Sequence, residues 1–195
     1  MAATKIISFF ICLNIILLCA LGASGINSRG RDGNTERSCS YYHGKPTRQE
    51  LLAIFQSQLG IRELTGRNDG REVEMYLHAV GLKKGPPWCA AFVSWGYGMV
   101  GIRGARSAWS PDWFPAGRVI WKQGQGQEPE PCDVFGIYFP DKKRIAHVGI
   151  VEQWGESVLT IEGNTNDAGS REGDGVYRKR RLPRQLYAVS CWFAW

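Results

Sequence analysis

The sequence predicts an α+β domain in which helices come first and an antiparallel sheet follows. In the first half, apolar residues recur at the three- and four-residue spacing of an amphipathic helix. In the second half, short runs of β-branched and aromatic residues alternate with turn residues, which is typical of strands. This change of period along one chain favours helices packed on one face of a sheet.

Three helices are expected in the first half. Thr47 and Glu50 have the spacing of a capping box, and apolar residues follow them at helical intervals. A second helix ends near Gly81. A third begins at Cys89, because the Gly-Pro-Pro run at 85–87 stops any earlier helix and holds the chain extended.

The second half is expected to form five strands joined by short turns. Between the two halves, residues 101–126 are rich in Trp, Gly and Pro and are predicted to be a loop. Short turns favour antiparallel pairing of consecutive strands. The predicted strands are 133–139, 145–152, 158–162, 176–181 and 187–193.

The N-terminus differs from the rest of the chain. Residues 1–25 hold one basic residue, an apolar run and then small residues, the pattern of a secretory signal peptide. A membrane anchor is the alternative, but a span needs about 20 apolar residues and this run is shorter. Residues 26–45 are polar and aperiodic, and we expect a flexible arm. Residues 46–195 are then expected to form one domain.

Charge and export bear on the partners. The chain has a formal net charge of +6, and loss of Lys5 with the signal leaves it near +5. The basic run at 178–181 is compatible with nucleic-acid binding, but a solvated strand face is the commoner explanation, so no nucleic-acid partner is predicted. A basic exported protein suits an anionic polymer such as a cell wall. We expect a monomer, secreted or in the periplasm or cell envelope, with no membrane span after signal removal.

Cys89 is the candidate nucleophile. Unpaired N–H groups and the helix dipole at the first turn of a helix stabilise a thiolate, and the same N–H groups can bind an oxyanion. A buried structural cysteine is the alternative interpretation of this position alone. If Cys89 is free, at most one disulfide can form among the other cysteines outside the signal, which are Cys39, Cys132 and Cys191.

His147 is the candidate general base. His43 lies in the predicted arm and His78 lies on the flank of an amphipathic helix, whereas His147 interrupts a strand. Gly149 shares its face and leaves room for a ligand or another backbone. A base needs a third group to orient it.

Glu162 and Asn164 are the candidates for that third group. They lie two residues apart at the end of the next predicted strand, so both side chains emerge on one side if the backbone stays extended. Either side chain can accept a hydrogen bond from the imidazole and fix its tautomer.

Three segments in this order resemble the CHAP family, the cysteine- and histidine-dependent amidohydrolases and peptidases related to the NlpC/P60 hydrolases. They are Pro-Trp-Cys-Ala-Ala-Phe-Val at 87–93, Ala-His-Val-Gly-Ile-Val at 146–151 and Glu-Gly-Asn-Thr-Asn at 162–166. The resemblance implies a papain-like fold over roughly 47–195, with Cys89 as nucleophile, His147 as base, and Glu162 and Asn164 orienting it. Cys132 departs from the Gly that many relatives carry.

The resemblance implies hydrolysis of an amide bond in peptidoglycan by a thiol mechanism, with no cofactor. The sequence leaves open whether the enzyme is an amidase acting on the first amide after the lactyl group, which we slightly favour, or an endopeptidase. A catalytically idle wall-binding module of the same fold and a secreted protease or transamidase are the alternatives. Trp88, Trp109 and Trp113 are the predicted substrate contacts. The chain has no His-x-x-x-His or Cys-x-x-Cys pair, so no metal site is predicted.

Overall fold

The computed structural model describes residues 45–167 and 173–193. The predicted signal peptide at 1–25 and the predicted arm at 26–45, apart from Lys45, lie outside the described residues. Within the described ranges, no helix has both the length and the apolar character needed to cross a membrane.

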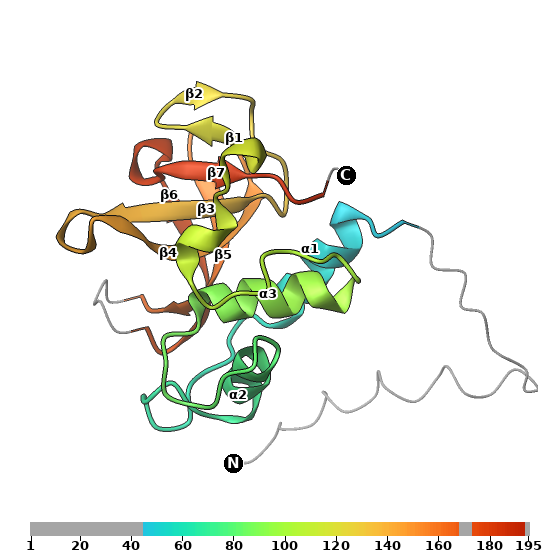
Figure 1. The fold of residues 1–195 in the computed structure, drawn as a ribbon, viewed down its shortest axis with the longest axis vertical. Coiled ribbons are helices and arrows are strands. Elements are labelled where there is room, and N and C mark those ends of the chain that lie inside the picture. The colour runs from blue at the N-terminus through green and yellow to red at the C-terminus, as the bar shows by residue number, and fades with distance from the viewer. Residues whose placement is uncertain (1–44, 168–172, 194–195) are drawn as a thin grey trace, which may run out of the picture. The chain divides into compact units, whose positions relative to one another are not determined.

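The described residues form an α+β fold of three α-helices and one seven-stranded antiparallel sheet (Figure 1), which confirms the predicted class. The helices are α1 (Arg48–Ser57), α2 (Arg71–His78) and α3 (Cys89–Met99). The strands are β1 (Val119–Lys122), β2 (Gln125–Gly126), β3 (Val134–Phe139), β4 (Arg144–Gln153), β5 (Val158–Thr165), β6 (Gly175–Arg181) and β7 (Ala188–Ser190).

The helix starts follow the local sequence signals. The Thr47 hydroxyl accepts a hydrogen bond from the Glu50 N–H at 3.2 Å, and the Glu50 carboxylate accepts one from the Thr47 N–H at 2.8 Å, so the predicted capping box is present. Helix α3 begins at Cys89, as predicted. The capping box therefore fixes the start of α1, and the Pro-containing segment immediately precedes the first residue of α3.

The sheet has the strand order β2-β1-β7-β3-β4-β5-β6. Consecutive strands β3 to β6 pair antiparallel as predicted, and the C-terminal strand β7 pairs with both β1 and β3. Strand β7 is shorter than the predicted strand at 187–193. The predicted loop at 101–126 contains the short strands β1 and β2, whose few residues give no period to detect.

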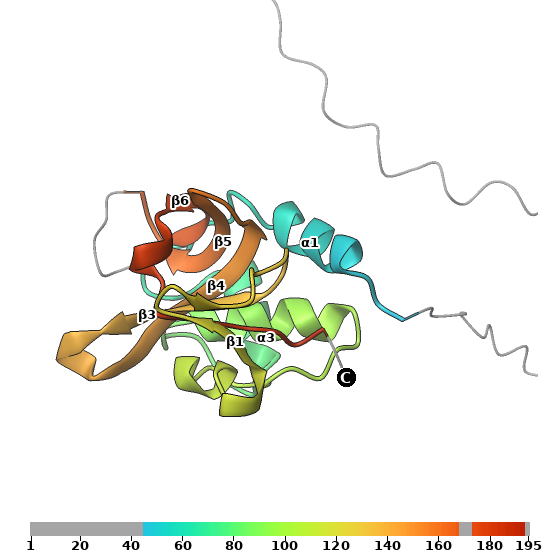
Figure 2. The ribbon, with the colours of Figure 1, turned by 90° about the horizontal axis from the view of Figure 1, so that it is seen from above.

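Helix α3 is the central helix of the fold. It packs against β4 and β5, whereas α1 and α2 have their main contacts with α3 (Figures 1 and 2). Its residues from 89 to 97 are all buried, because the segment is apolar on every side. Gly163 on β5 lets the two elements approach, since a Cβ there would lie 2.6 Å from the Trp88 ring and 2.8 Å from the Phe92 ring. The start of α3 and the end of β5 are thus held together.

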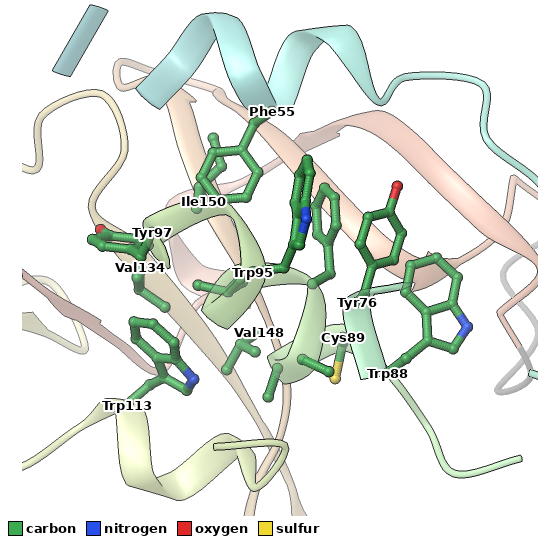
Figure 3. Packing of buried hydrophobic residues seen from close by; sticks show 14 of the residues in the cluster. Phe55, Tyr76, Trp88, Cys89, Trp95, Tyr97, Trp113, Val134, Val148 and Ile150 are labelled. Carbon is green, nitrogen blue, oxygen red and sulfur yellow. The ribbon is translucent and has the colours of Figure 1, made fainter. Parts of the chain in front are cut away.

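The core contains a layer of aromatic rings beside the start of α3. Tyr76 and Trp88 have ring centroids 5.5 Å apart, and Phe92 packs edge-on against Tyr76 at 5.1 Å. Figure 3 shows Tyr76 and Trp88 next to one another, with Cys89 at the adjacent helix start. Buried aromatic rings lose little freedom on folding and bury large areas, so this layer gives Cys89 a rigid support.

Candidate active site

The thiol of Cys89 lies at the first residue of α3 and is almost completely buried. No side chain caps this helix start, and no acidic residue occupies its first turn. The first N–H groups of a helix have no partner within the helix. The positive end of the α3 dipole at this position stabilises negative charge on the Cys89 sulfur.

Three neighbours of the Cys89 sulfur favour its ionised form. His147 is joined to it by a side-chain hydrogen bond, the Ser110 hydroxyl lies 3.7 Å from Sγ, and the Val148 backbone contributes a further hydrogen bond. Burial alone would raise the pKa of Cys89, but the hydrogen bond and charge of His147, with these two contacts, lower the pKa below the usual thiol value. The arrangement is that of an activated thiol.

The imidazole of His147 is held between a thiol and a carboxylate. Its Nε2 lies 2.8 Å from Oε2 of Glu162, which leaves Nδ1 to face Cys89. Burial opposes protonation, but the bonds to Cys89 and Glu162 outweigh it and raise the pKa of His147 to about 9. The Phe135 ring flanks the imidazole with centroids 6.4 Å apart, and it also fills the space over Gly149. The space beside Gly149 is therefore taken by Phe135 and the neighbouring strand.

Glu162 is a fully buried carboxylate. It has three side-chain hydrogen-bond partners, which are His147, Thr160 and Arg181. Arg181 donates to both of its oxygens, at 2.5 and 2.6 Å, and the Thr160 hydroxyl donates to Oε1 at 2.5 Å. Burial would raise the pKa of Glu162, but Arg181 and His147 together lower it to about 2. Glu162 therefore keeps its negative charge beside the imidazole at neutral pH.

Arg181 was not singled out as a site residue by the sequence. It belongs to the basic run at 178–181, and the strand alternation of β6 separates that run into two faces. Arg178 and Arg180 are exposed, whereas Lys179 and Arg181 are half-buried on the other face. The sequence predicts a strand here, but the whole run is expected to face solvent. Because a strand places alternate side chains on one face, the predicted strand already implies that only half of these charges face solvent.

Asn164 has a different partner from the one predicted. Its Nδ2 donates to Oδ1 of Asn68 at 2.7 Å, and its backbone adopts a left-handed conformation with φ of 55°. This turn breaks the extended geometry on which the shared side of Glu162 and Asn164 depended. The structure brings Cys89, His147 and Glu162 into one chain of contacts, and the role of Asn164 as an orienting group has no hydrogen bond to the imidazole to support it.

Asn68 links the two sides of the site. Its Nδ2 donates to the Gly85 carbonyl at 2.8 Å, and its own carbonyl accepts from the Gly85 N–H at 3.0 Å. Asn68 thus ties the segment that leads into Cys89 to Asn164 at the end of β5. Glu63 reinforces this link, because its carboxylate accepts from the Asn68 N–H at 2.8 Å and from the Trp88 indole at 2.9 Å.

The burial of two tryptophans corrects the prediction that all three contact substrate. Trp88 and Trp113 are fully buried in the aromatic core, so neither ring is available to a ligand. Large apolar rings in a Pro- and Gly-rich loop have more to gain from burial than from exposure, and the sequence pattern alone does not separate the two outcomes. Trp109 is 49% exposed and remains a candidate.

Cys89 differs from the other described cysteines. Within residues 45–167 and 173–193, Cys89, Cys132 and Cys191 are free thiols, while Cys39 lies outside the described residues. Burial raises the pKa of Cys132 to about 12, which makes that thiol unreactive. Cys132 also has a φ of 70°, a conformation that favours glycine, and this is the position at which the sequence departs from its resemblance.

A cavity of about 390 Å³ opens beside the imidazole. Its lining joins the β3–β4 turn to the ends of β5 and β6, and includes the polar side chains of His147, Asn164, Lys179 and Arg181. A substrate in this cavity would approach His147 from the side of Asn164.

The fold and the site define an α+β domain with a buried thiol–imidazole–carboxylate chain. A family model described as the CHAP domain matches residues 81–164, and this segment contains Cys89, His147 and Glu162. Residues 81–164 are therefore similar to the CHAP domain, as the sequence motifs predicted, and domains of this type are typically hydrolytic amidases or peptidases acting on cell-wall peptidoglycan. No curated protein and no solved structure matches the sequence.

Proposed function

We propose that this protein is an exported hydrolase that cleaves an amide bond of peptidoglycan with Cys89 as its nucleophile. The observation that carries the proposal is the continuous contact from Cys89 through His147 to Glu162, in which the thiol has a lowered pKa and the imidazole a raised one. Similarity to the CHAP domain and a basic net charge of +6 support a wall substrate. We further propose a papain-like arrangement, a monomer, and secretion directed by residues 1–25.

The reaction begins with attack of the Cys89 thiolate on the amide carbonyl carbon. The carbonyl oxygen takes the negative charge and is stabilised by backbone N–H groups at the start of α3. The His147 imidazolium donates its proton to the amide nitrogen, the C–N bond breaks, and an acyl-enzyme thioester remains.

Water then completes the cycle. Neutral His147 removes a proton from water, the resulting hydroxide attacks the thioester, and the C–S bond breaks to release the acid product. Cys89 leaves as a thiolate and His147 keeps the proton, so the starting ion pair is restored. Glu162 stays ionised throughout and orients the imidazole, because Arg181 holds its pKa near 2.

Digestion of purified cell walls tests the proposal. The wild-type protein should release soluble wall peptides, and mass spectrometry of the products identifies the bond from the newly formed amine and carboxyl ends. Cys89→Ala should release none, while Cys191→Ala, which removes a thiol outside the site, should behave as wild type.

Three outcomes would contradict the proposal. If the protein cleaves casein but leaves the walls uncleaved, it is a protease. If the protein sediments with the walls but releases no product, it is a binding module. Retention of wall hydrolysis by Cys89→Ala would refute the assignment of the nucleophile.

A further inference from the structure

Trp109 and Arg144 form a stacked pair on the surface beside the thiol. The Arg144 guanidinium carbon lies 3.9 Å from the centroid of the Trp109 ring, and that ring is 49% exposed. Trp109 directly precedes Ser110, whose hydroxyl lies 3.7 Å from the Cys89 sulfur. Trp109 is thus the sequence neighbour of a residue that contacts the reactive sulfur.

The Arg144 side is anchored to the strand of the general base. Arg144 is the first residue of β4 and His147 lies on the same strand, roughly 10 Å further along at about 3.3 Å per residue. Helix η1 (Ser110–Trp113), which follows Trp109, packs against β4. The stacked pair therefore joins the element that contacts the sulfur to the strand that carries the imidazole.

Hydrogen bonds hold both members of the pair in place, through the backbone of Trp109 and through the guanidinium of Arg144. The Trp109 N–H donates to the Ser107 hydroxyl at 2.9 Å, and that hydroxyl donates to Asp112 at 2.5 Å. Arg144 donates one hydrogen bond to the Ile145 carbonyl at 3.0 Å. An ordered indole that stays half-exposed presents a preformed apolar surface at low entropic cost.

Arg144 has no carboxylate partner among residues 45–167 and 173–193. In the same ranges Arg48, Arg62, Arg178 and Arg181 each form an ion pair with an acidic side chain. A guanidinium that stacks on an indole keeps N–H donors in its plane, and their geometry matches both oxygens of a carboxylate.

We propose that Arg144 and Trp109 form a subsite that binds a carboxylate group of the substrate next to the scissile amide. The guanidinium receives the carboxylate, and the indole packs against the aliphatic atoms that carry it. This inference rests on the proposed function and narrows its substrate to peptides with a free acid group. A neutral sugar cannot take the place of this acid group, because it offers the guanidinium no negative charge.

Two wall peptides that differ in one group test the subsite. One carries a free side carboxyl group next to the scissile amide, and the other carries the corresponding carboxamide. Wild-type protein should prefer the free acid by about tenfold in kcat/KM, mainly through KM, as expected for a hydrogen bond to a charged group. Arg144→Gln should reduce this preference to near one, and Arg144→Lys should retain part of it because it keeps the charge but lacks the fork.

Arg180→Gln is the matched control, because it removes the same charge from an exposed residue that contacts Ser157. It should keep the wild-type preference. Preservation of the preference in Arg144→Gln, or its loss in Arg180→Gln, would overturn the subsite.

Binding separates this inference from the proposed function. Calorimetry with the Cys89→Ala variant should show tighter binding of the free-acid peptide than of the carboxamide peptide. In the double variant that carries both Cys89→Ala and Arg144→Gln, the two affinities should be equal. Equal affinities in Cys89→Ala itself would overturn the subsite, whereas a failure of wild-type protein to hydrolyse either peptide would count against the proposed function.

Discussion

Nε2 of His147 lies 2.8 Å from Oε2 of Glu162, and Arg181 donates hydrogen bonds to both oxygens of the same carboxylate. The imidazole is therefore fixed at one nitrogen by a group that stays negatively charged, and its other nitrogen faces the thiol. This relationship determines both the protonation state of the site and its dependence on pH.

The rate of hydrolysis should fall on the alkaline side as His147 loses its proton. Although burial opposes protonation, the bonds to Cys89 and Glu162 raise the pKa of His147 to about 9, so the alkaline limb of kcat/KM should lie near pH 9. Glu162→Gln removes the negative charge beside the imidazole and should move this limb to lower pH. An unmoved limb in Glu162→Gln would show that the carboxylate does not set the pKa.

Arg181→Met should destabilise the protein by about 3 kcal/mol, because it leaves the buried Glu162 carboxylate without its main cationic partner. Urea denaturation at neutral pH measures this loss. Arg178→Met, on the exposed face of β6, removes a surface pair and should cost less than about 1 kcal/mol. Equal losses in the two variants would contradict the importance of the buried pair.

The same pair predicts how stability depends on acid. Despite its burial, Arg181 and His147 lower the pKa of Glu162 from 4.5 to about 2, so its contribution to the free energy of unfolding is complete above pH 4.5 and is lost as the pH falls toward 2. In Glu162→Gln the slope of stability against pH should be smaller over this range. Identical slopes in wild type and Glu162→Gln would show that the carboxyl titrates alike in both states of the chain.

Asn164→Gly should reduce kcat several-fold without moving the alkaline limb. The substitution keeps the left-handed backbone and removes the carboxamide that donates to Asn68 at 2.7 Å. Since Asn164 has that partner and no hydrogen bond to the imidazole, the pKa of His147 should be unaffected. A shift of the limb comparable to that in Glu162→Gln would restore the sequence-based role of Asn164 as an orienting group.

Trp113→Ala should lower the free energy of unfolding by about 3 kcal/mol or more, because Trp113 is fully buried. Trp109→Ala, at a half-exposed position, should change it by less than about 1 kcal/mol. Thermal and urea unfolding compare the two variants directly. A similar loss in both would mean that Trp109 belongs to the core and is not available for substrate.

The sequence predicted those parts of the fold that depend on local signals. The capping box at Thr47, the helix start at Cys89 and the antiparallel strands of the second half all follow from neighbouring residues. The strands β1 and β2 were missed because each has too few residues to show a period. The insertion of β7 between β1 and β3 is a long-range pairing that no local pattern encodes.

The site shows the same division. Cys89, His147 and Glu162 were identified from their places at a helix start and on two adjacent strands, and the structure brings them into contact. Arg181 was missed because its partner lies on another strand, 19 residues away in the sequence. Ser110 was missed because its contact with Cys89 depends on how a loop without regular period folds over the helix start.

The rate of alkylation of Cys89 as a function of pH tests the central claim most directly. Iodoacetamide modification followed by peptide mapping distinguishes Cys89 from Cys132 and Cys191. The thiolate–imidazolium pair predicts rapid alkylation of Cys89 well below about pH 8.5, the ordinary thiol pKa, and His147→Ala should shift the profile toward that value. A wild-type profile that rises only near the ordinary thiol pKa, and is the same in His147→Ala, would contradict the account.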